Sequence, residues 1–143
     1  MRRLLMALMC AVIVGTIPGA AWATPVSGVT GKVLGKGTSI GTIEVKNRGL
    51  TDVIVRHIII EPGGSLGWHS HPGELITVVH KGTLSRTLQD CTVVTTPAGQ
   101  SFVEPAGKRH LGRNQGIVPL ELYVTYVIPA GAPVSVDTAD PGC

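Results

Sequence analysis

Residues 62–74 read Pro62-Gly63-Gly64-Ser65-Leu66-Gly67-Trp68-His69-Ser70-His71-Pro72-Gly73-Glu74. His69 and His71 stand two residues apart, so in a β-strand both imidazoles lie on the same face. Two imidazoles on one face can share a metal ion. Gly63 forms a turn before this strand, and Gly82 closes the next turn after an apolar run. The segment therefore predicts a strand that presents a pair of candidate metal ligands.

Residues 99–114 form a second segment, which reads Gly99-Gln100-Ser101-Phe102-Val103-Glu104-Pro105-Ala106-Gly107-Lys108-Arg109-His110-Leu111-Gly112-Arg113-Asn114. A glycine turn leads into a short strand, and Pro105 and Gly107 favour another turn. His110 then begins a strand that we expect to run beside the first segment. This arrangement would bring a third imidazole to the pair.

The rest of the chain consists of short apolar runs separated by turn residues. The 143 residues include 19 Gly and 10 Pro, which favours strands and turns over helices. Strands of this kind with Gly and Pro between them predict an all-β sandwich or barrel. The run from Val53 to Ile60 is apolar at nearly every position and predicts a strand that is covered on both faces. The runs are Val53 to Ile60, Leu75 to Val79, Val93-Val94 and Leu120 to Ile128.

Together the two segments resemble the cupin superfamily. Its first motif is Gly-x5-His-x-His-x3,4-Glu-x6-Gly, and its second is Gly-x5-Pro-x-Gly-x2-His-x3-Asn. The second motif matches at every fixed position, and the first matches everywhere except at the glutamate. The matching residues are Gly63, His69, His71 and Gly82 in the first motif, and Gly99, Pro105, Gly107, His110 and Asn114 in the second.

The resemblance implies a double-stranded β-helix, a jelly-roll-like barrel, as a single domain over residues 24–143 with its motif core at 63–114. It also implies a divalent transition metal at the barrel mouth, held by His69, His71, His110 and a glutamate. Fe, Mn, Cu, Ni and Zn all suit imidazole-rich sites. Cupins commonly pair through their barrel sheets, so the resemblance further implies a homodimer.

The glutamate position departs from the family pattern. The pattern places it at Leu75 or Ile76, whereas Glu74 stands three residues after His71. In an unbroken strand Leu75, Thr77 and Val79 share the face of the histidines, and Glu74 points away. A bulge at residues 72–73 would reverse this and bring Glu74 onto the metal. Both registers bury acceptable residues, so Glu74 stays a fourth candidate ligand, and a three-imidazole site with Glu74 at the rim stays the alternative.

The first 23 residues predict a cleavable signal peptide. Arg2 and Arg3 precede an uncharged apolar run that Pro18-Gly19 ends, and the small residues before Thr24 suggest cleavage after Ala23. The run is too short to span a bilayer, so we expect a secreted or periplasmic protein without stable membrane association. The remaining chain carries ten basic and nine acidic residues. This balance argues against a nucleic-acid partner.

Cys91 and Cys143 remain after cleavage. In an oxidising compartment an even pair of cysteines predicts one disulfide, which would tie the C-terminal tail to the barrel wall. Two buried free thiols are the alternative.

Residues outside the motif positions have simpler explanations. We expect His57 and His80 to be structural or exposed, Lys108 and Arg109 to be solvated, and Asn114 to cap a local turn. One tyrosine of the run Tyr123-Val124-Thr125-Tyr126 is expected to reach the barrel interior.

Two classes of function follow from these residues. The first is a metal-dependent enzyme that acts on a small organic molecule, for example an oxygenase in which the metal acts as a Lewis acid or binds oxygen. The second is a non-catalytic barrel that binds a metal or a small ligand, or that serves a structural role. The fold alone does not distinguish them.

Overall fold

Ten strands and no helix make up the part of the chain that the computed structural model describes, residues 27–143. The strands are β1 (Thr38–Ser39), β2 (Thr51–Ile60), β3 (Ser65–Ser70), β4 (Glu74–Lys81), β5 (Thr83–Leu88), β6 (Val93–Pro97), β7 (Gln100–Glu104), β8 (His110–Arg113), β9 (Leu120–Pro129) and β10 (Val136–Asp137). The predicted signal peptide, residues 1–23, lies outside the described residues. Within residues 27–143 no helix has the length and apolar character needed to cross a membrane.

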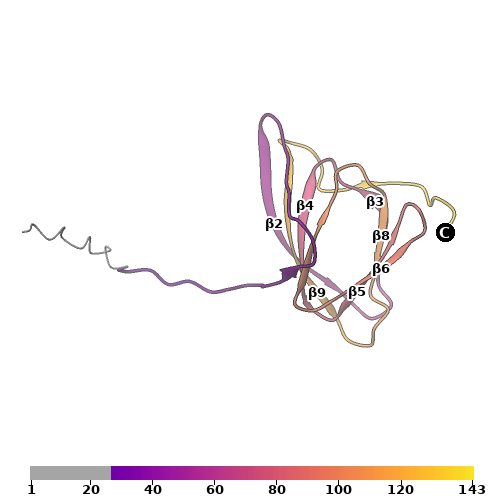
Figure 1. Ribbon diagram of the computed structural model, residues 1–143, viewed down its shortest axis with the longest axis horizontal. Coiled ribbons are helices and arrows are strands. Elements are labelled where there is room, and N and C mark those ends of the chain that lie inside the picture. The colour runs from indigo at the N-terminus through magenta and orange to yellow at the C-terminus, as the bar shows by residue number, and fades with distance from the viewer. Residues whose placement is uncertain (1–26) are drawn as a thin grey trace, which may run out of the picture. The chain divides into compact units, whose positions relative to one another are not determined.

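The strands form two five-stranded sheets that face each other in residues 32–143 (Figure 1). One sheet has the order β1-β7-β4-β9-β2, and the other has the order β10-β3-β8-β5-β6. Neighbouring strands are antiparallel except for β1 and β7. The all-β architecture expected from the short apolar runs is confirmed, and the two sheets fit the jelly-roll-like barrel that the resemblance implies.

The core lies between the sheets because each central strand turns alternate residues inward. In β9 every second residue from Leu120 to Ile128 is buried, and in β4 the buried residues are Leu75, Thr77 and Val79. Tyr126 is one of the inward residues of β9, while its neighbour Tyr123 stacks on His57 at the outside of the sheet. The expectation that one tyrosine reaches the interior is confirmed for Tyr126.

Strand β2 differs from the prediction that both of its faces are covered. The apolar run Val53 to Ile60 does form a strand, but it is not covered on both faces, because the side chains of Val53 and Val55 are 66% and 64% exposed. The physical reason is its place in the sheet. Within residues 27–143, β2 pairs only with β9 and ends the sheet order, and no second layer covers its outward residues.

Tight turns of the two motifs place the strands that carry the histidines. Gly63 and Gly107 have φ of 78° and 70°, a left-handed conformation that favours glycine, and they precede β3 and β8. The Gly107 N–H donates a hydrogen bond to the carbonyl of His71, with an N···O distance of 2.8 Å. The backbone itself therefore links the end of the first motif to the turn of the second.

The predicted disulfide is also present. Cys91, in the turn between β5 and β6, is bonded to Cys143 at the end of the chain. The segment before Cys143 includes β10, which pairs with β3. The C-terminal tail is thus held against the strand that carries His69.

Candidate metal site

Three imidazoles meet at the barrel interior, as the motif spacing predicted. His69 on β3 and His110 at the start of β8 are direct cross-strand partners, and His71 follows β3. The ring centroids are 4.5 Å apart for His69 and His110, 4.8 Å for His69 and His71, and 5.2 Å for His71 and His110. All three side chains are buried, and each offers a nitrogen within 4.8 Å of the others.

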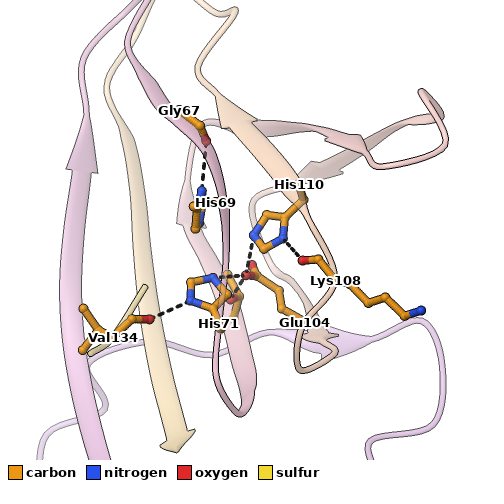
Figure 2. A network of polar contacts seen from close by, with 8 residues as sticks. Gly67, His69, His71, Glu104, Lys108, His110 and Val134 are labelled. Carbon is orange, nitrogen blue, oxygen red and sulfur yellow. Dashed lines mark hydrogen bonds and ion pairs between the residues drawn. The ribbon is translucent and has the colours of Figure 1, made fainter. Parts of the chain in front are cut away.

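Backbone carbonyls fix the orientation of all three rings (Figure 2). Each Nδ1–H donates to a carbonyl oxygen: that of His69 to Gly67 at 2.9 Å, that of His71 to Val134 at 2.7 Å, and that of His110 to Lys108 at 3.1 Å. Because a carbonyl oxygen only accepts, the proton of each neutral ring resides on Nδ1. The lone pair of each Nε2 is then available as a metal ligand, which is the usual arrangement of metal-binding histidines.

One of these nitrogens has no satisfactory partner in the protein. The Nε2 atom of His71 is buried, and it makes no hydrogen bond of acceptable geometry to any residue in 27–143. A buried polar atom without a partner is costly. A metal ion bound by Nε2 would remove this cost, so the residues present fit a divalent transition metal.

Glu104 supplies a carboxylate at the same place. Its Oε2 lies 3.0 Å from the Nε2 of His110 and 3.2 Å from the Nε2 of His71, and its Oε1 accepts a hydrogen bond from the Thr77 hydroxyl at 3.1 Å. Figure 2 shows the carboxylate between the two imidazoles. The Glu104 carboxylate therefore contacts two of the three imidazoles.

The pKa values of these groups follow from burial and from their mutual contacts. Burial raises the pKa of Glu104, but the favourable electrostatics of the neighbouring His110 and His71 imidazoles outweigh it, and the pKa is strongly lowered. Burial would lower the pKa of His110, but Glu104 raises it above its ordinary value. Burial lowers the pKa of His69. In the metal-free protein His110 thus takes a second proton more readily than His69 does, and a metal would compete with that proton.

Glu74 does not join this cluster, and this part of the predicted ligand set is corrected. The buried residues of β4 are Leu75, Thr77 and Val79, so the strand has the unbroken register and Glu74 lies on the other face. Its carboxylate accepts a hydrogen bond from the backbone N–H of Lys46 at 2.7 Å. The apolar pattern suits both registers equally, so only the pairing of β4 with its neighbours decides between them.

Sequence reasoning missed Glu104, although it lies in the second motif segment. It is the Cα partner of Leu75, one of the two positions where the family pattern places the glutamate. Cross-strand partners have Cβ atoms only about 5 Å apart, so a carboxylate on β7 reaches the place that one on β4 would have filled. The available signal was a single acidic residue in an otherwise uncharged strand, two positions after Phe102.

The remaining histidines and the motif asparagine behave as expected. His57 and His80 lie beside Tyr123, outside the cluster, and the Nε2 of His57 is 3.3 Å from a Glu121 oxygen. Asn114 is buried, donates from Nδ2 to two backbone carbonyls at 2.8 Å, and accepts from a backbone N–H at 3.0 Å. It is a structural residue of the turn after β8.

Comparison with known proteins agrees with this site and fold. The family model described as "Cupin domain" matches residues 56–131, which is more than half of the chain. The chain belongs to the cupin family. This cupin matches no curated protein.

Solved structures share the fold of this cupin. A protein from Bacillus halodurans is 26% identical with a TM-score of 0.51, and the match covers 59% of this chain and 69% of that one. The polyketide cyclase RemF from Streptomyces resistomycificus is 20% identical with a TM-score of 0.52, covering 62% and 64%. The DMSP lyase DddQ from Ruegeria pomeroyi is 19% identical with a TM-score of 0.54, covering 63% of this chain and 45% of the lyase. The last two likenesses show the fold alone.

Proposed function

We propose that this protein is an exported, metal-dependent cupin that acts on a small organic molecule. His69, His71 and His110 hold a divalent transition metal, and Glu104 provides the carboxylate. The observation that carries the proposal is that all three Nδ1 groups are bonded to backbone carbonyls, which leaves three Nε2 atoms directed at one place. Ordinary strand histidines have no reason to share this orientation.

Glu104 takes the role that the family pattern gives to a glutamate on the neighbouring strand β4. Thr77 holds its Oε1, and the imidazoles of His71 and His110 face its Oε2. A carboxylate held in this way needs no rearrangement to bind a cation. In the metal-free protein Oε2 contacts the imidazoles of His71 and His110 directly. A positive ion shared by these groups would replace those contacts.

When bound, Fe, Mn, Cu, Ni or Zn would supply Lewis-acid polarisation of a substrate oxygen, and the redox-active ions would also support oxygenase chemistry. The residues of the chain hold and orient the ligands. Tyr126 closes one side of the site, with its ring centroid 5.8 Å from that of His71. Leu75 and Leu122 line the same interior.

A non-catalytic metal-binding barrel is the second candidate, and one observation favours it. The cavity directly against the three histidines measures about 30 Å³. That volume holds a water molecule but no organic substrate. A substrate would have to approach from the larger cavity beside His110, which measures about 220 Å³.

Metal content tests the site. Purified protein, made without an affinity tag, is analysed by element-resolved mass spectrometry beside four variants. We expect about one transition metal per chain in the wild type, its loss in His110→Ala, and a lower metal content in Glu104→Gln. The matched controls His80→Ala and Glu74→Gln should keep the metal. No metal in the wild type, or equal loss in Glu74→Gln, would contradict the proposed ligand set.

Ligand access separates the enzyme from the closed binding site. The Fe(II)-loaded protein is titrated with nitric oxide and followed by electron paramagnetic resonance. An accessible coordination position should produce a nitrosyl signal. An unchanged spectrum in a fully loaded protein would favour the non-catalytic barrel.

Export and pairing are further parts of the proposal. The expected signal peptide and the disulfide between Cys91 and Cys143 both suit an oxidising compartment. N-terminal sequencing of the mature protein should begin at Thr24.

The exposed apolar side chains of Val53 and Val55 on the edge strand β2 support a homodimer. Light scattering should show a dimer for the wild type and a monomer for Val55→Lys.

A further inference from the structure

A cavity of about 220 Å³ lies directly beside the candidate metal site. Its lining includes Glu104 and His110 of that site and three cationic residues, Arg86, Lys108 and Arg109. The volume is below the roughly 300–1,000 Å³ typical of pockets for drug-sized ligands. Arg86, Glu104 and His110 also line the smaller cavity against the histidines. A small ligand in the larger cavity would therefore contact the edge of the metal site.

Arg86 is held in place without a polar partner. Its guanidinium carbon lies 3.4 Å from the centroid of the Phe102 ring. Its Nε is buried and makes no hydrogen bond, and none of the acidic side chains in residues 27–143 has an oxygen within 4.0 Å of the guanidinium. Stacking on an aromatic ring uses the flat face of a guanidinium and leaves the N–H edge free. This edge has the geometry that binds a carboxylate through two parallel hydrogen bonds.

The charges around the cavity favour an anion. Arg86, Lys108 and Arg109 oppose two carboxylates, Asp90 and Glu104. The Glu104 carboxylate is already occupied, because its two oxygens face the imidazoles and the Thr77 hydroxyl. Asp90 accepts a hydrogen bond from the backbone N–H of Thr92 at 3.0 Å. Three cationic residues therefore face two carboxylates, which leaves an excess of positive charge around the cavity.

The same wall also has apolar members. Leu88 and Pro105 line the cavity together with the cationic side chains. Apolar contact beside a guanidinium suits a molecule that combines an anionic group with a short carbon skeleton. An inorganic ion would make no use of these two residues.

We infer that this cavity binds a small organic carboxylate, with Arg86 as the residue that receives the carboxylate group. The inference rests on the proposed function for the fate of the bound molecule, which would lie beside the metal. The binding itself requires only the residues of the cavity. Lys108 and Arg109 add attraction from the rim, where Lys108 is exposed and Arg109 half-buried.

Calorimetric titration of chelator-treated protein tests the inference. The probes are acetate, succinate and benzoate, with acetamide and benzamide as neutral counterparts and sulfate as an inorganic anion. We expect at least one carboxylate to bind at least tenfold more tightly than its amide and than sulfate. Arg86→Met should weaken this binding at least tenfold, because it removes the charge-assisted hydrogen bonds to the carboxylate. Arg86→Lys should retain part of it, because it keeps the charge but loses the two-pronged geometry.

Two controls keep the test decisive. Arg113→Met removes an exposed arginine of β8 and should leave the binding unchanged. The melting temperature of Arg86→Met should stay within about 3 °C of the wild type, because methionine can still cover Phe102 and no hydrogen bond is lost. No carboxylate binding in the wild type, equal binding in Arg86→Met, or sulfate binding as tight as that of the carboxylates would overturn the inference.

Failure of carboxylate binding can be distinguished from failure of the proposed metal site. Repeating the titration after addition of Zn²⁺, a redox-inert ion, reports on both sites in one sample. Carboxylate binding that depends on Arg86 in a protein that takes up no metal would refute the proposed function and leave this inference standing. Stoichiometric metal without carboxylate binding would refute this inference alone.

Discussion

The disulfide between Cys91 and Cys143 connects the stability of the barrel to the geometry of the metal site. It closes a loop with a sequence separation of 52 residues. The tail that it anchors carries the Val134 carbonyl, which accepts the Nδ1–H of His71 at 2.7 Å. Cys91→Ala/Cys143→Ala should therefore change two independent observables, the free energy of unfolding and the affinity for metal.

The magnitude of the first effect follows from loop closure. In the chain-entropy model a loop of this length raises the free energy of unfolding by about 4 kcal/mol at 25 °C. For a domain of this size that corresponds to a fall in Tm of roughly 15 °C in the double variant. Scanning calorimetry of the metal-free protein measures it. Adding a reductant to the wild type should produce a similar fall, and the double variant should not respond to the reductant.

The second effect should be smaller, because the tail keeps other contacts. β10 still pairs with β3, and Val134 still packs against the core. Loss of the partner that orients a metal-binding histidine typically costs 10- to 100-fold in affinity, and we expect about tenfold. A double variant that unfolds within about 1 kcal/mol of the wild type would refute the loop-closure reasoning. Unchanged metal affinity with the expected loss of stability would show that the Val134 carbonyl stays in place without the disulfide.

Three further changes have defined consequences. Asn114→Ala should lower the free energy of unfolding by roughly 3 kcal/mol in urea titrations, because it removes three hydrogen bonds and leaves buried backbone groups without partners; a loss below about 1 kcal/mol would contradict this role. Gly73→Ala should be strongly destabilising, because an added Cβ would lie 2.1 Å from the Val127 carbonyl oxygen, whereas Gly41→Ala, with open space around it, should cost little; equal melting temperatures would disprove the steric argument. In chelator-treated protein the pKa of Glu104 is lowered on folding, so its contribution to stability should be complete above about pH 5 and be lost as the pH falls further, since the unfolded state then binds more protons. Glu104→Gln should flatten this part of the stability profile, and an unchanged slope would show that other carboxyl groups produce it.

The sequence by itself determined the fold class and most of the site. The spacing of His69, His71 and His110, together with the turn glycines around them, was sufficient to predict three converging imidazoles, and its resemblance to the cupin motifs implied the barrel. This succeeds because the information is local. Residues two apart share a strand face, and a glycine with positive φ places a turn whatever the rest of the chain does.

The carboxylate of the site depended on the tertiary structure. Glu74 was the nearest acidic residue in sequence, but β4 turns it away, and Glu104 reaches the site from the neighbouring strand. Strand register has a period of two, so a single-residue bulge exchanges one face for the other. The residues of β4 were compatible with both faces. Pairing of Leu75 with Glu104 and with Tyr126 settled the register.

The exposure of β2 and the surroundings of the His71 and Arg86 side chains likewise depended on the tertiary structure. The apolar strand β2 has an exposed face because it ends its sheet, and strand order is a long-range property that composition does not encode. The partners of the His71 and Arg86 side chains lie far away in sequence: Val134 accepts from His71, and Phe102 lies under Arg86. Local sequence determines which side chains a strand presents, whereas the packing of distant strands determines what those side chains meet.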